Sequence, residues 1–339
     1  MLHAFSMTWW CTGVRWRVGD GPVLGWYAPG RGERESPLVF GGVVAFRVRG
    51  GRRCLGVWRG GRWTACPVGA AVAGRVTRAQ CEECARVDRA HSVAADTFAD
   101  DPRPYHVYVA WFGPGLVKVG ITGVARGGAR LLEQGAVAYT WLGQGPLMAA
   151  RRAEELLRTA LGVPDRIPYE RKRALRARLP GVAERAGELA EVHRRAAALG
   201  DWPESLERLP CEVVDHGEVF GLEAIGGFGS AGRVVDELTD GGVVAGELVA
   251  AAGPDLYVAV GVSGRRGRGQ GASGQRGRGQ EGSGQGASGQ GVVIDSRLMS
   301  GWRLGGLDGL GETGGEGDGE WSGVTVPVRG MPVVQGGLF

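Results

Sequence analysis

The chain has 339 residues, 43% of them hydrophobic, which allows two domains, or one domain with appendages, around a sizeable core. Glycine is unusually frequent at 64 residues, yet there is no Gly-X-Y period and no run of 18 apolar residues, which excludes collagen and a transmembrane helix. The net charge of +4 hides an asymmetry, because residues 1–200 are basic whereas residues 201–262 carry 12 acidic and 2 basic side chains.

This asymmetry indicates either an anionic partner for the basic part or neutralisation of the two parts across an internal interface. Only two of the 40 basic residues are lysines, Lys118 and Lys172, so arginine counts say more about genome composition than about function. The start of the chain lacks a basic segment followed by a long apolar stretch, so no secretory signal is expected. The six cysteines are then expected to be reduced thiols of a cytoplasmic protein, and no membrane partner is expected.

Residues 9–65 have the pattern of β-structure, with alternation over Val43–Arg49 and a turn at Gly50–Gly51. Six tryptophans lie in this stretch among arginines. Such a mixture can form a nucleic-acid surface, or a sheet core covered by arginine stems, and the sequence leaves both interpretations open.

Most of the cysteines follow at Cys54, Cys66, Cys81 and Cys84. The Cys81–Cys84 pair has the C-x2-C spacing that lets two thiolates face one metal, so we expect a structural zinc site, with His91 as an alternative fourth ligand. The alternative is a group of ordinary buried thiols. Cys11 and Cys211 are interpreted as core residues.

The segment from Tyr105 to Ala136 predicts two strands around the loop Gly113-Pro114-Gly115. With Phe112 opposite Leu116, His106 faces Thr122, Tyr108 faces Gly120 and Ala110 faces Lys118. Alternation then places these eight residues on one side of the hairpin and a continuous apolar surface on the other. Because Ala110 and Gly120 are small, we expect room for a ligand among the polar side chains.

A helix is expected at about 125–134, with Arg126, Arg130 and Gln134 in one polar stripe, and a strand at 139–142. In the next helix, at about 147–161, Glu154 shares the apolar side and is expected to point inward. A buried carboxylate needs a cation, which here is Arg130, Lys118 or a metal ion.

The remaining sequence predicts helices over 168–199, short strands over 211–262 and a Gly/Gln/Arg repeat over 263–291 that cannot bury apolar area. Order is expected to resume at Val292, with a flexible loop at 308–323 and a closing strand from Pro327. We therefore predict an α+β fold in which a small antiparallel sheet flanked by helices lies between β-rich parts. The predicted segments are 8–98, which holds the cysteines, 99–200 as the core, 201–262, 263–291 and 292–339.

The core resembles a GIY-YIG nuclease domain. His106-Val107-Tyr108 and Lys118-Val119-Gly120 stand where that family has its two tripeptides, Arg130 resembles its helical arginine, and Glu154 its metal-binding glutamate. The resemblance implies a small sheet flanked by helices, a magnesium or manganese ion on Glu154, a Tyr108 that activates water and an Arg130 that stabilises the phosphate.

One position departs from the family pattern, because Lys118 stands where the family has its second tyrosine. A lysine can still contact phosphate as a point charge, or act as a base if desolvation lowers its pKa. We therefore predict Tyr108, Lys118, Arg130 and Glu154 as catalytic residues, and His106, Thr122 and Arg126 as substrate-binding residues.

More specifically, the chain resembles the actinobacterial form of a bacterial family called domain of unknown function 2797. The matching pieces are Asp100–Tyr108, Leu116–Thr122, Leu131–Ala136, Gly145–Leu157 and Val163–Tyr169. The first functional hypothesis is a metal-dependent phosphodiesterase that acts on DNA or RNA. The alternatives are a nucleic-acid-binding or regulatory module without turnover, and a protein-interaction scaffold in which the basic residues 1–200 dock on the acidic residues 201–262.

Overall fold

The computed structural model describes residues 9–59, 62–90, 101, 103–228, 232–261, 290–307 and 323–331. Within these ranges the fold is α+β, as expected from the sequence. His91, residues 263–289 of the predicted repeat insert and residues 308–322 of the predicted loop lie outside the described residues. No helix in the described ranges is both long enough and apolar enough to cross a membrane.

The N-terminal part begins with a three-stranded antiparallel sheet of β1 (Trp10–Arg17), β2 (Gly21–Ala28) and β3 (Gly32–Pro37). A short hairpin of β5 (Val57–Arg59) and β6 (Arg62–Thr64) and helix α1 (Glu82–Ala90) follow. The tryptophans of this part differ in burial, because Trp16 and Trp26 belong to the core, as in one of the two interpretations, whereas Trp58 is 40% exposed.

A five-stranded antiparallel sheet forms the middle of the chain. Its strands, in spatial order, are β10 (Glu207–Arg208), β9 (Ala138–Pro146), β7 (Pro104–Trp111) and β8 (Val117–Gly123), and β11 (Val214–Asp215) also pairs with β9. Strand β7 therefore lies between β8 and β9, and the hairpin has the predicted register.

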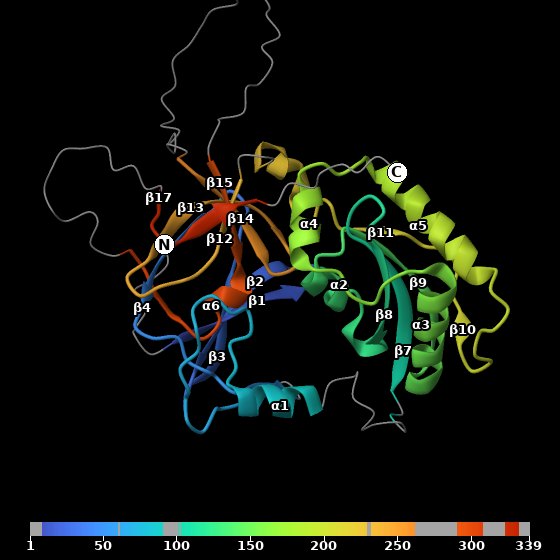
Figure 1. Ribbon diagram of the computed structural model, residues 1–339, viewed down its shortest axis with the longest axis horizontal. Coiled ribbons are helices and arrows are strands. Elements are labelled where there is room, and N and C mark those ends of the chain that lie inside the picture. The colour runs from blue at the N-terminus through green and yellow to red at the C-terminus, as the bar shows by residue number, and fades with distance from the viewer. Residues whose placement is uncertain are drawn as a thin grey trace, which may run out of the picture.

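Helices cover both faces of this sheet. The apolar face of β7 and β8 packs against α3 (Leu147–Leu161) and α5 (Val182–Ala197), which lie at the right of Figure 1. Residues of α2 (Ala129–Gln134) and α4 (Tyr169–Arg176) contribute to a second apolar cluster on the opposite face. The helix expected over 168–199 is thus two helices, because Pro180 and Gly181 interrupt it.

An eight-stranded sheet forms most of the C-terminal part and appears at the left of Figure 1. Its strands, in spatial order, are β16 (Arg303–Gly305), β4 (Val43–Arg49), β13 (Val243–Ala252), β14 (Asp255–Val260), β15 (Gln290–Asp295), β12 (Arg233–Val235) and β18 (Val328–Gly330), with β17 (Gly323–Val324) beside β13. The 3-10 helix η3 (Leu222–Phe228) and the short helix α6 (Ser296–Met299) complete this part.

The sheets do not follow the segment boundaries expected from the sequence. Strand β4, from the predicted segment 8–98, pairs with β13 of the C-terminal sheet. Strands β10 and β11, from the predicted segment 201–262, extend the middle sheet. Long-range strand pairing therefore joins parts of the chain that composition alone separates.

Buried ion pairs connect the middle sheet's helices to the C-terminal sheet. Arg173 and Arg176 of α4 both bond the carboxylate of Asp255, and Arg173 also bonds Asp295. A further pair, between Arg185 of α5 and Asp215 of β11, lies within the middle part itself. Part of the acidic segment 201–262 thus neutralises the basic part inside the molecule, which is one of the two interpretations of the charge asymmetry.

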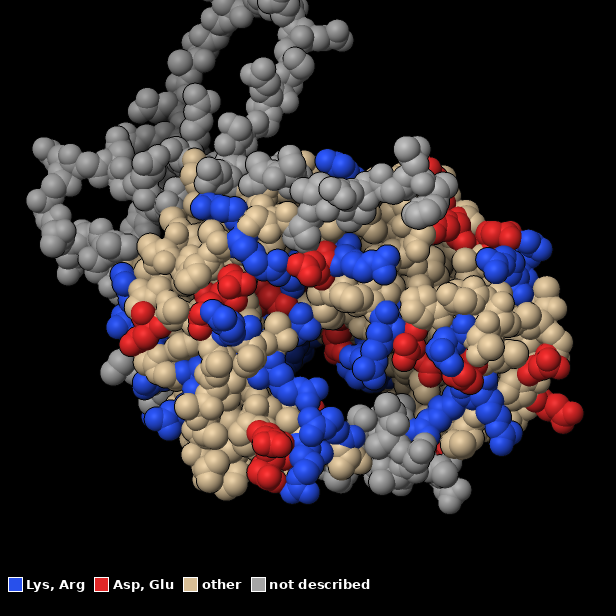
Figure 2. Space-filling model, in the orientation of Figure 1, with Lys and Arg blue, Asp and Glu red and all other residues tan. Residues whose placement is uncertain are grey.

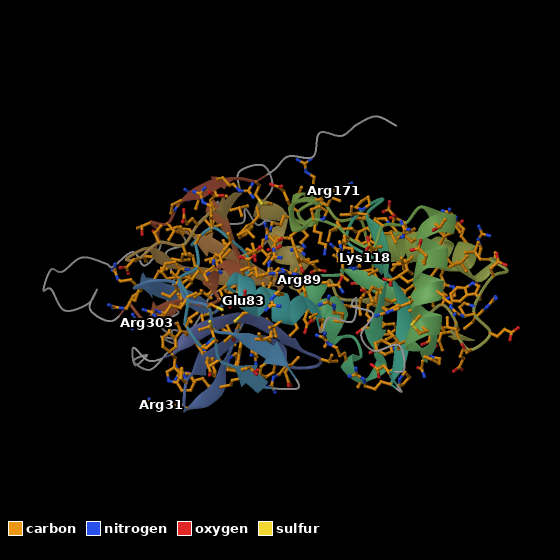
Figure 3. All side chains as sticks on the ribbon, turned by 60° about the horizontal axis from the view of Figure 1, so that its bottom comes forward. Arg31, Glu83, Arg89, Lys118, Arg171 and Arg303 are labelled. Atoms are coloured by element: carbon orange, nitrogen blue, oxygen red, sulfur yellow. The ribbon has the colours of Figure 1, made fainter. Side chains whose placement is uncertain are left out.

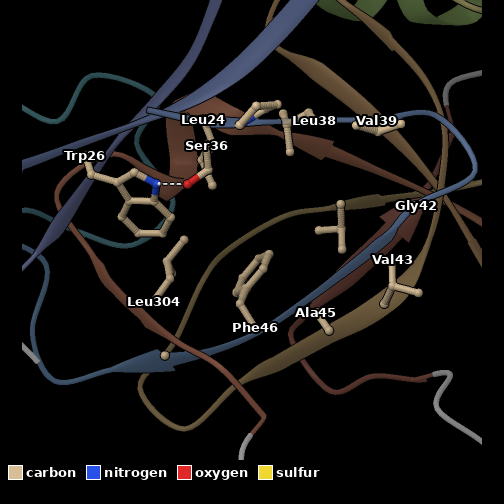
Figure 4. A pocket seen from close by; sticks show the side chains of 13 residues that line it. Leu24, Trp26, Ser36, Leu38, Val39, Gly42, Val43, Ala45, Phe46 and Leu304 are labelled. Atoms are coloured by element: carbon tan, nitrogen blue, oxygen red, sulfur yellow. Dashed lines mark hydrogen bonds between the residues drawn. The ribbon is translucent and has the colours of Figure 1, made fainter. Parts of the chain in front are cut away.

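An apolar pocket of about 240 Å³ lies where the N-terminal sheet meets β4 (Figure 4). Leu24, Phe46 and Leu304 form much of its wall, and the Trp26 indole Nε1 donates a hydrogen bond of 3.0 Å to the Ser36 hydroxyl. The two β-rich sheets therefore pack with a gap between their apolar faces.

Candidate functional site

The hairpin of β7 and β8 places the predicted polar residues on one side of the middle sheet. The backbone N–H of Phe112 donates to the carbonyl of Leu116 over 2.9 Å, and His106, Tyr108 and Ala110 lie opposite Thr122, Gly120 and Lys118. The other side carries Val107, Val109 and Trp111, all completely buried. The alternation expected from the sequence is therefore present.

The surroundings of Tyr108 are not the open space for a ligand that the sequence predicts. Its side chain is 2% exposed, and the amide N–H of Gln134 donates a hydrogen bond of 2.9 Å to its hydroxyl oxygen. A Cβ atom placed on Gly120 would lie 2.3 Å from this hydroxyl oxygen. The space over Gly120, where room for a ligand was expected, is thus filled by the phenol of the chain itself, and burial raises the pKa of Tyr108.

Lys118 lies beside this phenol and is partly buried. Its Nζ is 5.8 Å from the centre of the Tyr108 ring and donates a 3.1 Å hydrogen bond to the backbone carbonyl of Asp165. Burial, and then the nearby charge of Arg130, lower the pKa of Lys118 to about 8. A substantial fraction of this amine is therefore neutral near physiological pH.

Glu154 of α3 is partly buried on the side of the helix that faces the sheet, as expected, whereas Glu155 is exposed and pairs with Arg158. Burial raises the pKa of Glu154, and the charge of Lys118 opposes that shift. Among the described residues, none forms a hydrogen bond or ion pair with the Glu154 carboxylate. Neither Lys118 nor Arg130, the two side chains that the sequence offered as partners, pairs with it.

The two arginines predicted for phosphate contact share a carboxylate. Arg126 donates to both oxygens of Glu133 at 2.7 and 2.6 Å, and Arg130 lies 3.6 Å from the same group. The helix expected over 125–134 is broken at Gly127–Gly128 into the 3-10 turn η2 (Val124–Arg126) and α2. The break separates Arg126 from the predicted polar stripe. Gln134 is also not part of an exposed stripe, because it is buried and its amide bonds the Tyr108 hydroxyl.

The remaining predicted substrate contacts differ in exposure. The partly buried His106 ring stacks on Trp141 with ring centres 4.3 Å apart, and burial lowers the pKa of His106. Thr122 is buried. His106 is accordingly the more accessible of the two, held flat against an aromatic ring.

The four predicted catalytic residues therefore lie close enough to influence one another. The pKa of Tyr108 responds to the charges of Arg130 and Glu154, and that of Lys118 responds to the same two groups. Asp165 is a further member, because its charge acts on both Lys118 and Glu154. The only sequence signal for Asp165 is its place in a Pro-Asp turn just after the helix that carries Glu154.

The four cysteines at 54, 66, 81 and 84 form a second candidate site. Their sulfur atoms all lie within 4.8 Å of one another, and the sulfurs of Cys66 and Cys81 are 3.9 Å apart. Gly56, with φ of 103°, allows this close approach, because a Cβ there would lie 1.9 Å from the carbonyl oxygen of Thr64. Cys211, expected in the core, is exposed, whereas Cys11 is buried as expected.

Local hydrogen bonds favour a thiolate in this cluster. Although burial acts in the opposite direction, backbone N–H groups of Ala70 and Val68 lower the pKa of Cys66 to about 6. Cys81 precedes α1 and Cys84 lies in its first turn, so the start of this helix sets the spacing of two of the sulfurs. Four sulfurs in this arrangement have the number and type of ligands of a tetrahedral metal site.

Lysine and arginine side chains gather around a hollow at the centre of one face of the molecule (Figure 2). Acidic side chains are interspersed among them (Figure 2). The gathered basic side chains give this face an attraction for a polyanion.

A search of curated proteins and a search of solved structures each gave no match to this chain. A comparison with protein-family models gave a match over residues 41–268, which spans more than half of the chain and includes both candidate sites. The matching family is described as "Protein of unknown function (DUF2797)". The chain, with its four-cysteine cluster and its helix-flanked sheet, belongs to this family.

Proposed function

We propose that the protein is a metal-dependent phosphodiesterase that acts on nucleic acid at the site around Lys118 and Glu154. The observation that carries the proposal is the Glu154 carboxylate, which is partly buried, has a raised pKa and has no ion-pair partner among the described residues. Leaving a carboxylate in such surroundings is unfavourable unless a cation joins it. Lys118 and Arg130, the two protein cations that the sequence offered as partners, are directed elsewhere, to the Asp165 carbonyl and to Glu133.

The residues present fit a divalent cation. Magnesium and manganese prefer carboxylate oxygens, and Glu154 and Asp165 offer two carboxylates, of which Asp165 is near enough for its charge to act on Glu154. When bound, such an ion would polarise the phosphate and lower the pKa of a coordinated water. The resemblance of the sequence to a GIY-YIG domain also motivates the proposal, and the helix that follows β9 carries Glu154, the residue to which that resemblance assigns the metal.

The side chains have distinct roles in this proposal. Lys118, with a pKa of about 8, contacts the phosphate as a charge or accepts a proton from water. Arg126 and Arg130 bind the substrate phosphates from an exposed position. Tyr108, held by Gln134 and beneath the solvent surface, is a positioning residue for Lys118 rather than the group that meets water.

The test is cleavage of labelled single-stranded and duplex DNA and RNA with magnesium or manganese. Glu154→Gln keeps the shape of the side chain and should lower the rate about 100-fold or more, because it removes the metal-binding charge. Glu155→Gln, which alters an exposed glutamate one position away, is the matched control and should leave the rate unchanged. Equal rates for the wild type and Glu154→Gln would refute the proposal.

A second candidate function is nucleic-acid binding without turnover. The observation that favours it is the buried Tyr108 hydroxyl, whose hydrogen bond to Gln134 leaves it without access to a water on Glu154. In that case the protein should bind nucleic acid with an affinity that falls as salt rises, should cleave none of the substrates, and should bind equally well after Glu154→Gln.

We also infer that Cys54, Cys66, Cys81 and Cys84 hold a structural zinc ion, because four sulfurs within 4.8 Å of one another match the ligands of a closed tetrahedral site. Elemental analysis of the purified chain should give about one zinc per molecule. Cys81→Ser should lower the zinc content and the melting temperature, whereas Cys211→Ser, at an exposed cysteine outside the cluster, should change neither. Unchanged zinc in Cys81→Ser would contradict the assignment.

A further inference from the structure

A hollow beside the cysteine cluster has a lining of unusual chemistry. It measures about 280 Å³ and lies between the ends of β1 and β2 and the segments around Cys54 and Cys66. Its lining residues are Trp10, Tyr27, Pro29, Arg53, Cys54, Leu55, Ala65, Cys66, Gly69 and Arg303. The lining therefore combines two aromatic rings with two guanidinium groups and contains no carboxylate.

The aromatic part of the hollow is fixed by the N-terminal sheet. Trp10 and Tyr27 are direct partners across β1 and β2, so their side chains lie next to each other on one face. Trp63 of β6 extends this aromatic surface, with its ring centre 5.7 Å from that of Tyr27. The sheet thus holds a ring platform in place without relying on a mobile loop.

The polar part of the hollow has unused hydrogen-bonding capacity. The indole N–H of Trp10 is buried and has no hydrogen-bond partner among the described residues. Arg53 is exposed, and none of the residues that the structure describes offers an acceptor or a carboxylate that pairs with its guanidinium. A buried donor without a partner costs free energy unless a ligand or water satisfies it.

We propose that this hollow binds one nucleotide, with the base stacked on the platform of Trp10 and Tyr27 and the phosphate at the guanidinium groups of Arg53 and Arg303. A flat ring can stack on aromatic side chains regardless of its sequence, and a ring nitrogen or carbonyl can accept from the Trp10 indole. Cys54 and Cys66 also line the hollow, so the anionic phosphate belongs at the arginines rather than beside the cysteines.

The size of the hollow supports a single nucleotide. Pockets for small ligands usually have volumes of roughly 300–1,000 Å³, so 280 Å³ lies just below that range and suits one small ligand rather than several. The basic character of the surrounding sequence adds charge complementarity, since residues 1–95 carry 14 basic and 6 acidic side chains. Figure 3 shows Arg303 on the β-rich part and Lys118 on the middle sheet, so the hollow and the proposed phosphodiesterase site occupy different places.

The inference goes beyond the proposed function, because base binding here requires no cleavage. The nucleotide can be free, or it can be one unit of a single strand that continues elsewhere on the molecule. Both sources share the same chemistry of base and phosphate. A free nucleotide and a strand segment are distinguished by whether a mononucleotide binds on its own.

The experiment is calorimetric titration and tryptophan fluorescence of the full chain carrying Glu154→Gln, so that oligonucleotides stay intact. The probes are adenosine 5′-monophosphate, adenosine, inorganic phosphate, a single-stranded oligothymidylate of about eight nucleotides and a duplex of equal length. Saturable binding of the monophosphate, tighter than that of adenosine or phosphate, is expected for a free nucleotide. Binding of the single strand alone, in preference to the duplex, is expected for a strand segment.

Two substitutions test the lining. Arg53→Gln, at an exposed side chain, should raise the dissociation constant of the bound probe about tenfold, and Trp10→Leu should raise it about tenfold or more. Arg31→Gln is the matched control, since Arg31 is an exposed arginine in the turn between β2 and β3 and does not line the hollow. Trp10→Phe, which keeps the ring and removes the N–H, should weaken binding less than Trp10→Leu.

The proposal is overturned if no probe shows saturable binding to the folded protein, or if Arg53→Gln binds every probe as tightly as Arg31→Gln does. The two proposals fail separately. Loss of cleavage in the wild type with intact binding at the hollow refutes only the phosphodiesterase. Cleavage that depends on Glu154, together with binding that is insensitive to Arg53, refutes only the nucleotide site.

Discussion

Asp255→Asn tests the buried ion network that joins α4 to the C-terminal sheet. Asp255 is completely buried, and its carboxylate accepts hydrogen bonds of 2.9 and 2.6 Å from Arg173 and of 2.6 Å from Arg176. Asparagine keeps the shape of the side chain but removes the charge and one acceptor oxygen. Two buried guanidinium groups then lose their shared counter-ion.

The expected loss of stability is large because Arg176 loses its carboxylate partner. Arg173 retains a carboxylate, since it also bonds Asp295, whereas Arg176 keeps only the Tyr257 hydroxyl at 3.2 Å. Removing one partner of a buried ion pair usually costs about 3–5 kcal/mol. We therefore expect Asp255→Asn to lower the free energy of unfolding by about 4 kcal/mol.

The assay is urea unfolding followed by tryptophan fluorescence and by circular dichroism. Glu170→Gln is the control, because the pair of Glu170 with Arg329 is exposed and should contribute under about 1 kcal/mol. A loss in Asp255→Asn as small as the loss in the control would show that solvent reaches the network. The reasoning from burial would then be wrong.

Two further predictions concern the core. Lys118 and Lys172 are the only lysines of the chain, so reductive methylation with a carbon-13 label gives two lysine signals. The signal of Lys118 should titrate near pH 8 and that of Lys172 near pH 6, because burial lowers both pKa values. The pKa values of these two amines are lower in the folded chain than in the unfolded chain. Their contribution to stability is therefore lost as the pH falls from about 10 through the folded-state values. Titration midpoints near 10.5 would contradict the burial. Gly120→Ala should lower the melting temperature by several degrees, because its Cβ would meet the Tyr108 hydroxyl, whereas Gly187→Ala, on an open face of α5, should be neutral or stabilising by about 1 kcal/mol. An unchanged melting temperature for Gly120→Ala would show that Tyr108 moves aside freely.

Local patterns in the sequence predicted the hairpin and the helix behind it. The alternation on either side of Gly113-Pro114-Gly115 fixes the register of β7 with β8, and the apolar spacing over 147–161 gives the bounds of α3. The same spacing predicted that Glu154, rather than Glu155, lies on the inner side. These features depend on neighbours a few residues apart, which a sequence displays directly.

The surroundings of Tyr108 could not be predicted in this way. Whether its phenol meets solvent depends on the hydrogen bond from Gln134 of α2, the helix that follows the break at Gly127–Gly128, and on packing within the second apolar cluster. The pairing of Arg126 with Glu133 likewise spans seven positions across that break. Each of these contacts depends on a backbone turn that glycine permits but does not specify.

The choice of the strand that pairs with β4 was the other feature that local sequence patterns could not predict. Alternation in Val43–Arg49 indicates a strand, but the choice of β13 as its neighbour depends on side chains about 200 residues away. The gathering of the four sulfurs was easier to predict, because Cys81 and Cys84 have a spacing typical of metal ligands. The positions of Cys54 and Cys66 relative to them depend on a hairpin that only the folded chain reveals.

The pairing of β4 with β13 has a consequence for synthesis on the ribosome. At about 5–20 residues per second, β4 is translated roughly 10–40 seconds before its partner β13. During that interval both edges of the strand lack the neighbours of the folded sheet, and its first residue, Val43, is exposed together with the nearby Val39. The nascent chain therefore needs protection until its last third has emerged, and removing that last third should yield an aggregating fragment rather than a smaller working protein.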